Sequence, residues 1–173
     1  AWMLQKIDGD RGVGGLVEAL KSEDDDVCQQ AAKALGMIGD KRVVKALVAA
    51  LEGRDSSVRV SVVWALGRIG DGLVAEKAML DALQDNAEPV RIFAAEGLGK
   101  IGGRQAVAFL LRALKDRAVS VRRNAARSLW KIGDKNSEVL ANGLMDALAH
   151  EEVFVRRKAA QVIGYYANDE QAR

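Results

Sequence analysis

The chain of 173 residues is 49% hydrophobic and 29% charged, with a formal net charge of +2. This balance is typical of a globular protein and excludes a disordered chain, and no apolar run approaches the roughly 18 residues that a membrane span needs. The sequence has no signal-peptide pattern, and its single cysteine, Cys28, cannot form an internal disulfide. We therefore expect a cytoplasmic protein that makes no membrane contact.

Charge is unevenly distributed along the chain. Residues 1–86 carry 11 basic and 14 acidic side chains, whereas residues 87–173 carry 15 basic and 10 acidic ones. The overall charge is too small to indicate nucleic-acid binding by itself. An anionic partner is nevertheless expected to prefer the second half of the chain.

A thirteen-residue pattern recurs along the chain, starting with an incomplete copy in which residues 1–7 match residues 32–38. The full copies are VCQQAAKALGMIG at 27–39, VRVSVVWALGRIG at 58–70, VRIFAAEGLGKIG at 90–102, VRRNAARSLWKIG at 121–133 and VRRKAAQVIGYYA at 155–167. Each follows a leucine by seven residues, and successive opening valines are 31, 32, 31 and 34 residues apart. A period of this length indicates a repeat architecture.

Each repeat is predicted to contain two helices. The first is short, as in VVKALVAAL at residues 43–51. The second contains the recurring pattern, which places Val121, Ala125, Leu129 and Ile132 on one apolar face. A hairpin of this kind therefore has an apolar side that it cannot bury alone.

Residues that start and stop helices bracket these segments. Asp24 and Asp55 precede second helices and are predicted N-caps, and Pro89 suits a first helical turn. Gly-Asp pairs are predicted to end one repeat and begin the next, at residues 39–40, 70–71 and 133–134.

Stacked hairpins bury their apolar sides in one continuous core, and no strand pattern competes. We therefore predict an all-α fold, an α-solenoid in which about five and a half helical hairpins form a right-handed superhelix. Its single domain spans residues 1–173. The boundaries are a partial repeat at 1–8, repeats at about 9–39, 40–70, 71–102, 103–133 and 134–167, and a tail or further repeat at 168–173.

The ends of a solenoid normally carry polar caps. Here Trp2, Met3 and Leu4 belong to the opening helix, and NDEQAR at 168–173 stands where a further first helix would start. We expect the chain to be a segment of a longer array and to associate end to end when it is alone.

The pattern VRxxAAxALGxIGD, with its period near 31, resembles the short HEAT-like repeats of the phycobilisome-lyase type over essentially the whole chain. The resemblance implies that second helices line the concave inner surface of the solenoid and first helices the convex one. Such repeats serve unrelated tasks, so the resemblance predicts the fold and not the function.

One arginine recurs in the second residue of the pattern, as Arg59, Arg91, Arg122 and Arg156. We predict that it is structural and pairs with acidic groups of the turns between helices, such as Asp55, Asp85 or Asp116. Aligned charges of this kind form a ladder of ion pairs along the stack. Cys28 replaces the arginine in the first full repeat and is expected to be a small, partly buried side chain.

Residues that do not recur are the candidates for individual function. Five cations are predicted to form one basic patch across two neighbouring second helices that lie roughly 10 Å apart. They are Arg123, Arg127, Lys131, Arg157 and Lys158.

The earlier repeats carry apolar side chains in the corresponding region, namely Val60, Trp64, Ile92 and Phe93. These are expected to face solvent as a contact surface, unless the curvature of the superhelix buries them. Trp130 stands where the other repeats have Gly36, Gly67, Gly99 and Gly164. It either fills a local gap, linked to a longer turn at 134–139, or projects toward the groove beside Arg123.

The sequence offers no candidate catalytic site. The chain has one histidine, His150, which excludes a multi-histidine metal site. Deoxyhypusine hydroxylases resemble the chain in the Val-Arg pattern but place His-Glu directly after it, where this sequence has other residues. GDRGVGG at 9–15 follows a predicted helix and not a strand, so it is a poor match to a phosphate-binding loop. We expect no catalytic residues, no metal and no cofactor.

Three functions remain open. The first is a non-catalytic scaffold whose concave groove binds a protein or peptide with apolar and acidic groups. The second, which the resemblance implies, is a phycobilin lyase subunit or chaperone, with aromatic residues stacked on a linear tetrapyrrole and arginines on its propionates. The third is nucleic-acid binding, as in HEAT-like DNA glycosylases, which the near-neutral charge and the small basic patch disfavour.

Overall fold

The computed structural model describes the backbone of residues 2–70 and 72–171 and the side chains of residues 9–70, 72–133 and 136–164. The described backbone forms ten α-helices and a short 3-10 helix, with no strand. They are α1 (Trp2–Ala19), α2 (Asp25–Ile38), η1 (Lys41–Val43), α3 (Val44–Ala49), α4 (Ser56–Ile69), α5 (Gly72–Ala82), α6 (Glu88–Ile101), α7 (Arg104–Ala113), α8 (Val119–Lys135), α9 (Ser137–Leu148) and α10 (Val153–Gln171).

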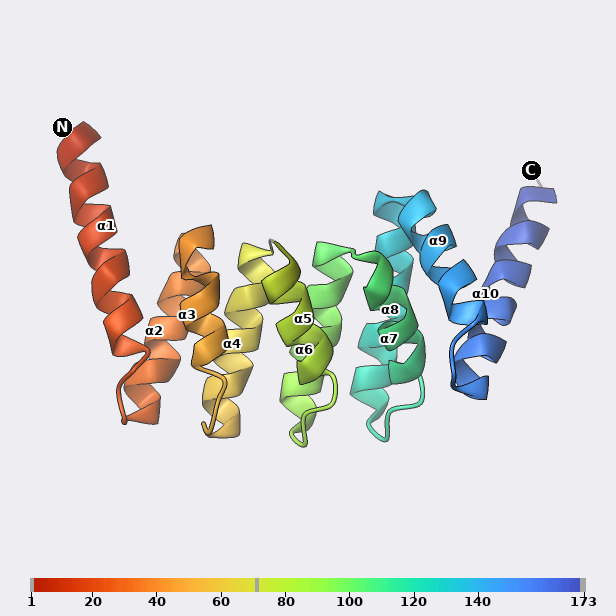
Figure 1. Ribbon diagram of the computed structural model, residues 1–173, viewed down its shortest axis with the longest axis horizontal. Helices are drawn as coiled ribbons and strands as arrows, with labels where there is room; N and C mark the ends of the chain where they lie inside the picture. The colour runs from red at the N-terminus through yellow and green to blue at the C-terminus, as the bar shows by residue number, and fades with distance from the viewer. Residues whose placement is uncertain (1, 71, 172–173) are drawn as a thin grey trace.

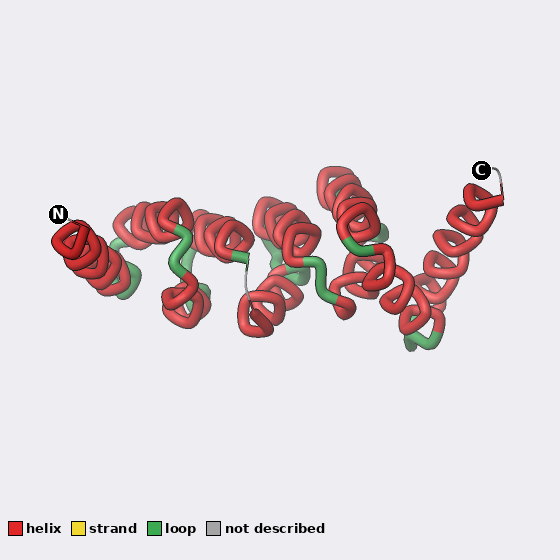
Figure 2. Tube along the Cα trace, turned by 90° about the horizontal axis from the view of Figure 1, so that it is seen from above, coloured by secondary structure: helices red, strands yellow, loops and turns green. Residues whose placement is uncertain are grey.

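The helices form two layers of a solenoid, as predicted (Figure 1). The second helices α2, α4, α6 and α8 pack side by side in chain order, and α4, α6 and α8 are each accompanied by a shorter first helix, α3, α5 and α7, in the other layer (Figure 2). Side chains on the shared apolar face are buried, including the predicted Val121, Ala125, Leu129 and Ile132. The core is therefore continuous from repeat to repeat.

Helix ends follow the predicted signals in the first repeats. The carboxylate of Asp24 accepts hydrogen bonds from the N–H groups of Asp26 and Val27, and that of Asp55 accepts from Ser57. Pro89 lies in the first turn of α6. Gly39 and Gly70 end their helices in the left-handed conformation, with φ of 76° and 60°, which glycine adopts without steric cost.

The second helices approach one another closely because small residues face each other between them. A Cβ atom at Gly67 would lie 3.1 Å from the Cα of Gly97 in the next repeat. A Cβ at Gly99 would lie 2.6 Å from the Cβ of Ser128 in α8. The glycines of this column at positions 36, 67 and 99 therefore set the spacing between successive second helices from α2 to α8.

The predicted repeat boundary between residues 8 and 9 is wrong, because α1 continues through it without a turn. Glycine permits helical as well as left-handed geometry, and Gly9 is helical here. Asp10 does not cap a new helix, and its carboxylate accepts a hydrogen bond of 2.6 Å from Arg42. The side chains of Trp2, Met3 and Leu4 lie outside the described residues.

The predicted boundary at Gly133 is also wrong. Helix α8 runs through Gly133 to Lys135, and Asn136 then caps α9 by accepting a hydrogen bond of 3.0 Å from the N–H of Val139. The three extra residues in this repeat thus lengthen α8 by almost one turn and do not form a longer loop. The chain consequently leaves α8 in a different direction from that in earlier repeats.

The last hairpin is displaced from the regular stack. Helix α9 packs against α7, where Gly143 leaves no space for a Cβ, which would lie 2.5 Å from a methyl group of Val107. An ion pair between Arg104 and Asp146 joins the same two helices. Helix α10 follows α9 and packs on α9 and α7, so among the described residues it does not stack along α8 (Figure 2).

The predicted arginine ladder is present in the middle of the array. The Nε and Nη2 of Arg59 donate to the two carboxylate oxygens of Asp85 at 2.7 and 2.9 Å, and Arg91 holds Asp116 in the same way at 2.8 and 3.0 Å. Each pair links one second helix to the turn of the next repeat. Asp55, by contrast, serves only as the cap described above.

The ladder stops at Arg122. Its Nη1 donates to the carbonyl oxygens of Asp116 and Arg117, as that of Arg91 does to its own turn. The next residue of the aspartate column is His150, whose Nδ1 accepts a hydrogen bond from the N–H of Glu152 at 3.1 Å. No described carboxylate therefore pairs with the Nε–Nη2 edge of Arg122.

A methyl group at position 99 is expected to destabilise the array. Gly99→Ala places a Cβ against Ser128, and overpacking of this kind costs about 1–3 kcal/mol, more than the roughly 1 kcal/mol that alanine contributes to helix formation. Gly164→Ala is the matched control, because a Cβ there meets nothing within 4 Å. Urea unfolding followed by circular dichroism should show a loss of stability for the first variant only. Equal midpoints would contradict the role of this column.

Two arginines of the same column are expected to differ in their effect on stability. The side chains of Arg91 and Asp116 are 5% and 12% exposed, so Arg91→Ala leaves a largely buried carboxylate without its bidentate partner and should lower the free energy of unfolding by about 3 kcal/mol. Arg122→Ala removes only hydrogen bonds to carbonyl groups and should cost about 1–2 kcal/mol. Similar losses of stability for both variants in thermal unfolding would show that the ion pair with Asp116 adds no more stability than the hydrogen bonds to carbonyl groups.

Stability is expected to fall in acid through the Arg59–Asp85 pair. The guanidinium of Arg59 holds the pKa of the Asp85 carboxyl below its usual value, so the unfolded chain binds more protons than the folded one in this range. The contribution is present above about pH 4 and is lost as the pH falls toward the folded pKa. Asp85→Asn should show a flatter dependence than the wild type in unfolding curves between neutral and acidic pH. If the stability of both proteins changed with pH in parallel, the Arg59–Asp85 pair would not be the source of the acid sensitivity.

Candidate functional site

The four predicted apolar contact residues do not form an exposed surface. Val60, Trp64, Ile92 and Phe93 are half-buried, and three of them, all but Ile92, pack against the core. The ring of Trp64 lies where a side chain at Gly36 would project, and the guanidinium of Arg68 lies 5.2 Å from its centroid. The expectation that these residues face solvent is therefore met only in part, because the close spacing of second helices covers part of each side chain.

The predicted cations fall into two groups. Arg123 and Arg127 on α8 are exposed, and neither pairs with a described carboxylate, whereas Lys131 on the same helix is half-buried. Arg157 on α10 is exposed. Lys158 is half-buried, donates to Gln161 at 2.9 Å and lies 5.8 Å from the ring centroid of Phe154.

These cations do not form the single basic patch that the sequence predicts. The prediction assumes that α8 and α10 are neighbours at the usual spacing, but α10 follows α9 onto α7. The free positive charge of the second-helix layer is consequently concentrated on α8. Arg123 and Arg127 lie one helical turn apart on its surface.

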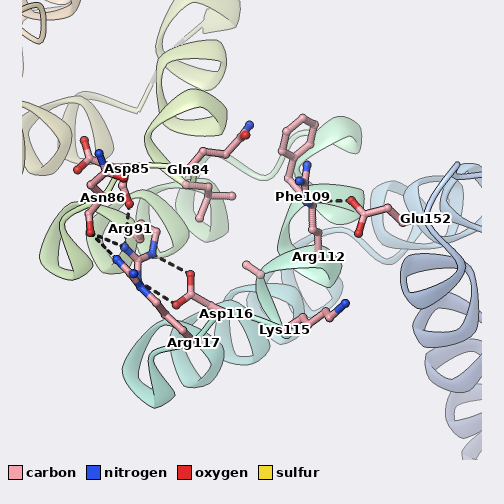
Figure 3. Close-up of a pocket in the computed structure, with 12 residues that line it drawn as sticks. Gln84, Asp85, Asn86, Arg91, Phe109, Arg112, Lys115, Asp116, Arg117 and Glu152 are labelled. Carbon is pink, nitrogen blue, oxygen red and sulfur yellow. Dashed lines mark hydrogen bonds and ion pairs between the residues drawn. The ribbon is translucent and has the colours of Figure 1, made fainter.

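The hollow shown in Figure 3 lies among the turns of three successive hairpins and has a volume of about 530 Å³. Its charged groups are mostly paired with one another: Arg91 with Asp116, and Arg112 with Glu152 at 2.9 Å. Arg117 donates to the carbonyl of Asn86 at 2.9 Å. The ion pairs extend the ladder and stabilise the turns, whereas the exposed Lys115 and Arg117 pair with no described carboxylate.

Trp130 projects from the protein surface. Its side chain is 65% exposed, although the equivalent glycines at 36, 67 and 99 are buried. Ala126, one turn earlier, is also exposed, whereas its equivalents Ala32, Val63 and Ala95 are completely buried. This side of α8 is therefore uncovered at the place where each earlier second helix receives the next one.

Sequence reasoning left the position of Trp130 undecided and missed the exposure of Ala126. The available signals were the 34-residue spacing, the tryptophan in a glycine column and the histidine in an aspartate column. All three mark the junction between the last two hairpins. Read together, they would have indicated that the junction is irregular.

Neither Cys28 nor His150, the two side chains considered for catalysis, lies in surroundings typical of a catalytic residue. Cys28 is buried and its thiol donates to the carbonyl of Leu20 at 3.3 Å, and burial raises the pKa of this thiol, which disfavours a nucleophilic thiolate. His150 lies in the turn between α9 and α10, as predicted. Within the described residues, no group of three or more His, Cys, Asp or Glu side chains could hold a metal ion. No helix in that part of the chain is both long and apolar enough to cross a bilayer.

Three solved structures have a similar architecture. One is an engineered protein, with 24% identity, coverage of 86% of this chain and 76% of that one, and a TM-score of 0.57. The second is the complex of CpcE and CpcF of phycocyanin lyase from Nostoc sp. PCC7120, with 22% identity, coverage of 86% and 62%, and a TM-score of 0.62. The third is a designed armadillo repeat protein in complex with the peptide (KR)4, with 18% identity, coverage of 92% and 84%, and a TM-score of 0.59.

Likeness at this level of identity establishes the fold alone, and the chain spans less than two thirds of the lyase chain. A comparison with curated protein sequences gives no significant match. The model of HEAT repeats matches residues 13–86 and 76–164, which together cover most of the sequence. The chain belongs to the HEAT repeat family.

Proposed function

We propose that the protein is a non-catalytic scaffold that binds a partner protein or peptide on the surface of its second-helix layer. The observation that supports this most is the pair of exposed cations Arg123 and Arg127, which no described carboxylate neutralises. Arg59 and Arg91, by contrast, are paired with aspartates. Such a surface suits a partner with acidic groups. The half-buried apolar residues at 60, 64, 92 and 93 would contribute the edges of their side chains.

The armadillo-like neighbour with its bound peptide supports the proposal by analogy of fold only. Its ligand, by name, consists of lysine and arginine, whereas the cations of α8 would repel such a peptide. We therefore assign the opposite charge to the partner of this chain. The analogy supports a solenoid surface as a place where an extended or helical segment can bind.

A phycobilin lyase subunit or chaperone remains the alternative, because a phycocyanin lyase complex shares the fold. This role would use aromatic side chains next to arginines, and Trp130 and Arg127 provide one such exposed combination. Purification from cells that make linear tetrapyrroles would test it, since a bound pigment absorbs visible light. Nucleic-acid binding is disfavoured, because the cations do not extend over neighbouring repeats.

The test of the scaffold proposal is a pull-down from the source cell with the intact chain as bait, followed by affinity measurement with the protein recovered. Arg123→Glu with Arg127→Glu should weaken binding strongly, because two attractive charges become repulsive. Stability should change by only about 0.5 kcal/mol, since both side chains are exposed. The weakening should be greatest at low salt.

Arg123→Glu with Arg127→Glu is a better test variant than Trp64→Ala. Trp64 packs between helices, so its removal would also change stability. Arg11→Glu with Lys45→Glu is the matched control, since both side chains are exposed on other helices. A partner that binds all three proteins equally well would exclude the surface of α8 as its site.

A further inference from the structure

One side of α8 presents a continuous exposed stripe. Val119, Arg123, Ala126 and Trp130 are spaced by four, three and four residues, which places them on one face over about three helical turns. We refer to these four residues as the open face of α8. Trp130 and Val119 are 65% and 57% exposed, so the face carries large apolar side chains in contact with solvent.

The same face of each earlier second helix holds another helix. In α2 it receives α4, where Gly36 meets Ala65, and in α4 it receives α6, where Gly67 meets Gly97. In α6 it receives α8 through Gly99 and Ser128. The open face thus has a geometry that repeatedly accepts a helix in this molecule, but α10 does not occupy it.

Arg122 lies beside the open face and lacks the carboxylate that its equivalents hold. In Arg59 and Arg91 the Nε–Nη2 edge binds both oxygens of an aspartate that precedes the incoming helix. The Nη1 of Arg122 is held by the carbonyl groups of its own turn in the same manner. The guanidinium is therefore already oriented, and a bidentate carboxylate site remains open on it.

The charged side chains of α8 that the structure describes are all positive. Arg122, Arg123 and Arg127 lie on or beside it, and none of the three pairs with a described carboxylate. A basic helix would be repelled there, whereas a helix with acidic flanks would complement it. Ala126 and Trp130 supply the apolar contact between the charges.

We propose that the open face of α8 binds an acidic amphipathic helix of a partner protein, which places small or apolar side chains on Ala126 and Trp130 and a carboxylate on Arg122. This inference rests on the proposed scaffold function and specifies the partner and its position. The partner helix takes the place that the next second helix occupies elsewhere in the array. Its carboxylate continues the ladder that stops at Arg122.

The probe is a labelled peptide copied from residues 84–101, stapled into a helix on its solvent side and made more acidic by Arg91→Glu and Lys100→Glu. This segment is the natural template, because it carries Asp85 and α6 and binds α4 through the equivalent face. Fluorescence anisotropy should show binding to the full chain. A version with lysine in place of every glutamate should not bind.

Arg122→Gln and Trp130→Ala in the full chain should each weaken binding by roughly tenfold or more, since one removes a charge-assisted pair and the other the main apolar contact. Arg156→Gln is the control for the first, because Arg156 makes the same turn contacts in α10. Met145→Ala is the control for the second, because Met145 is 61% exposed on α9. Both controls should bind within about twofold of the wild type.

A probe with Asp85→Asn tests the carboxylate directly. It should bind the wild type less tightly than the acidic probe does, and the difference should vanish with the Arg122→Gln protein, because the two groups interact with each other. No binding of the acidic probe at about 1 mM, or equal binding by all variants, would overturn the proposal. Self-association of the wild type that Trp130→Ala abolishes would also overturn it, since the occupant would then be a second copy.

The scaffold function can survive the failure of this inference. A native partner that is lost with Arg123→Glu and Arg127→Glu but retained by Trp130→Ala and Arg122→Gln would support the scaffold and exclude a helix that contacts Trp130 and Arg122. A partner retained by all variants would exclude both.

Discussion

The close approach of successive second helices is the constraint on which the rest of the structure depends. Where a glycine faces a small residue, as Gly67 faces Gly97, two helix backbones come together and their apolar faces merge into one core. At this spacing, Arg59 and Arg91 reach the turn of the next repeat and bind its aspartate there. The same spacing encloses Trp64 and Phe93, which a wider stack would leave exposed.

The junction after α8 shows what happens when this constraint is removed. A tryptophan replaces the glycine, and three added residues change where the chain leaves the helix. The hairpin that follows is held instead by Gly143 and by the Arg104–Asp146 pair, both of which join α9 to α7. These changes reinforce one another, because each moves the last second helix away from α8.

Most of the fold was predictable because it is repeated. Five copies of one pattern identify the buried face, the caps at Asp24 and Asp55 and the ladder arginines, since every copy reports on the same physical requirement. The errors at Gly9 and Gly133 have the opposite origin. A glycine permits both a turn and a continued helix, so the choice depends on neighbours that a single sequence pattern does not contain.

The candidate site was less predictable, because it too depends on neighbouring helices that a single sequence pattern does not contain. The exposure of Arg123 and Arg127 follows from their place on the helix, but the partial burial of Val60 and Ile92 depends on the distance between helices. A departure from the repeat has a meaning only in relation to what the repeat provides: Trp130 matters because glycines elsewhere admit a helix, and His150 matters because aspartates elsewhere bind an arginine. Where the stacking of a solenoid is interrupted, one helix face remains uncovered. Such a face needs few further changes to bind a partner helix, since it already has the shape that accepts one.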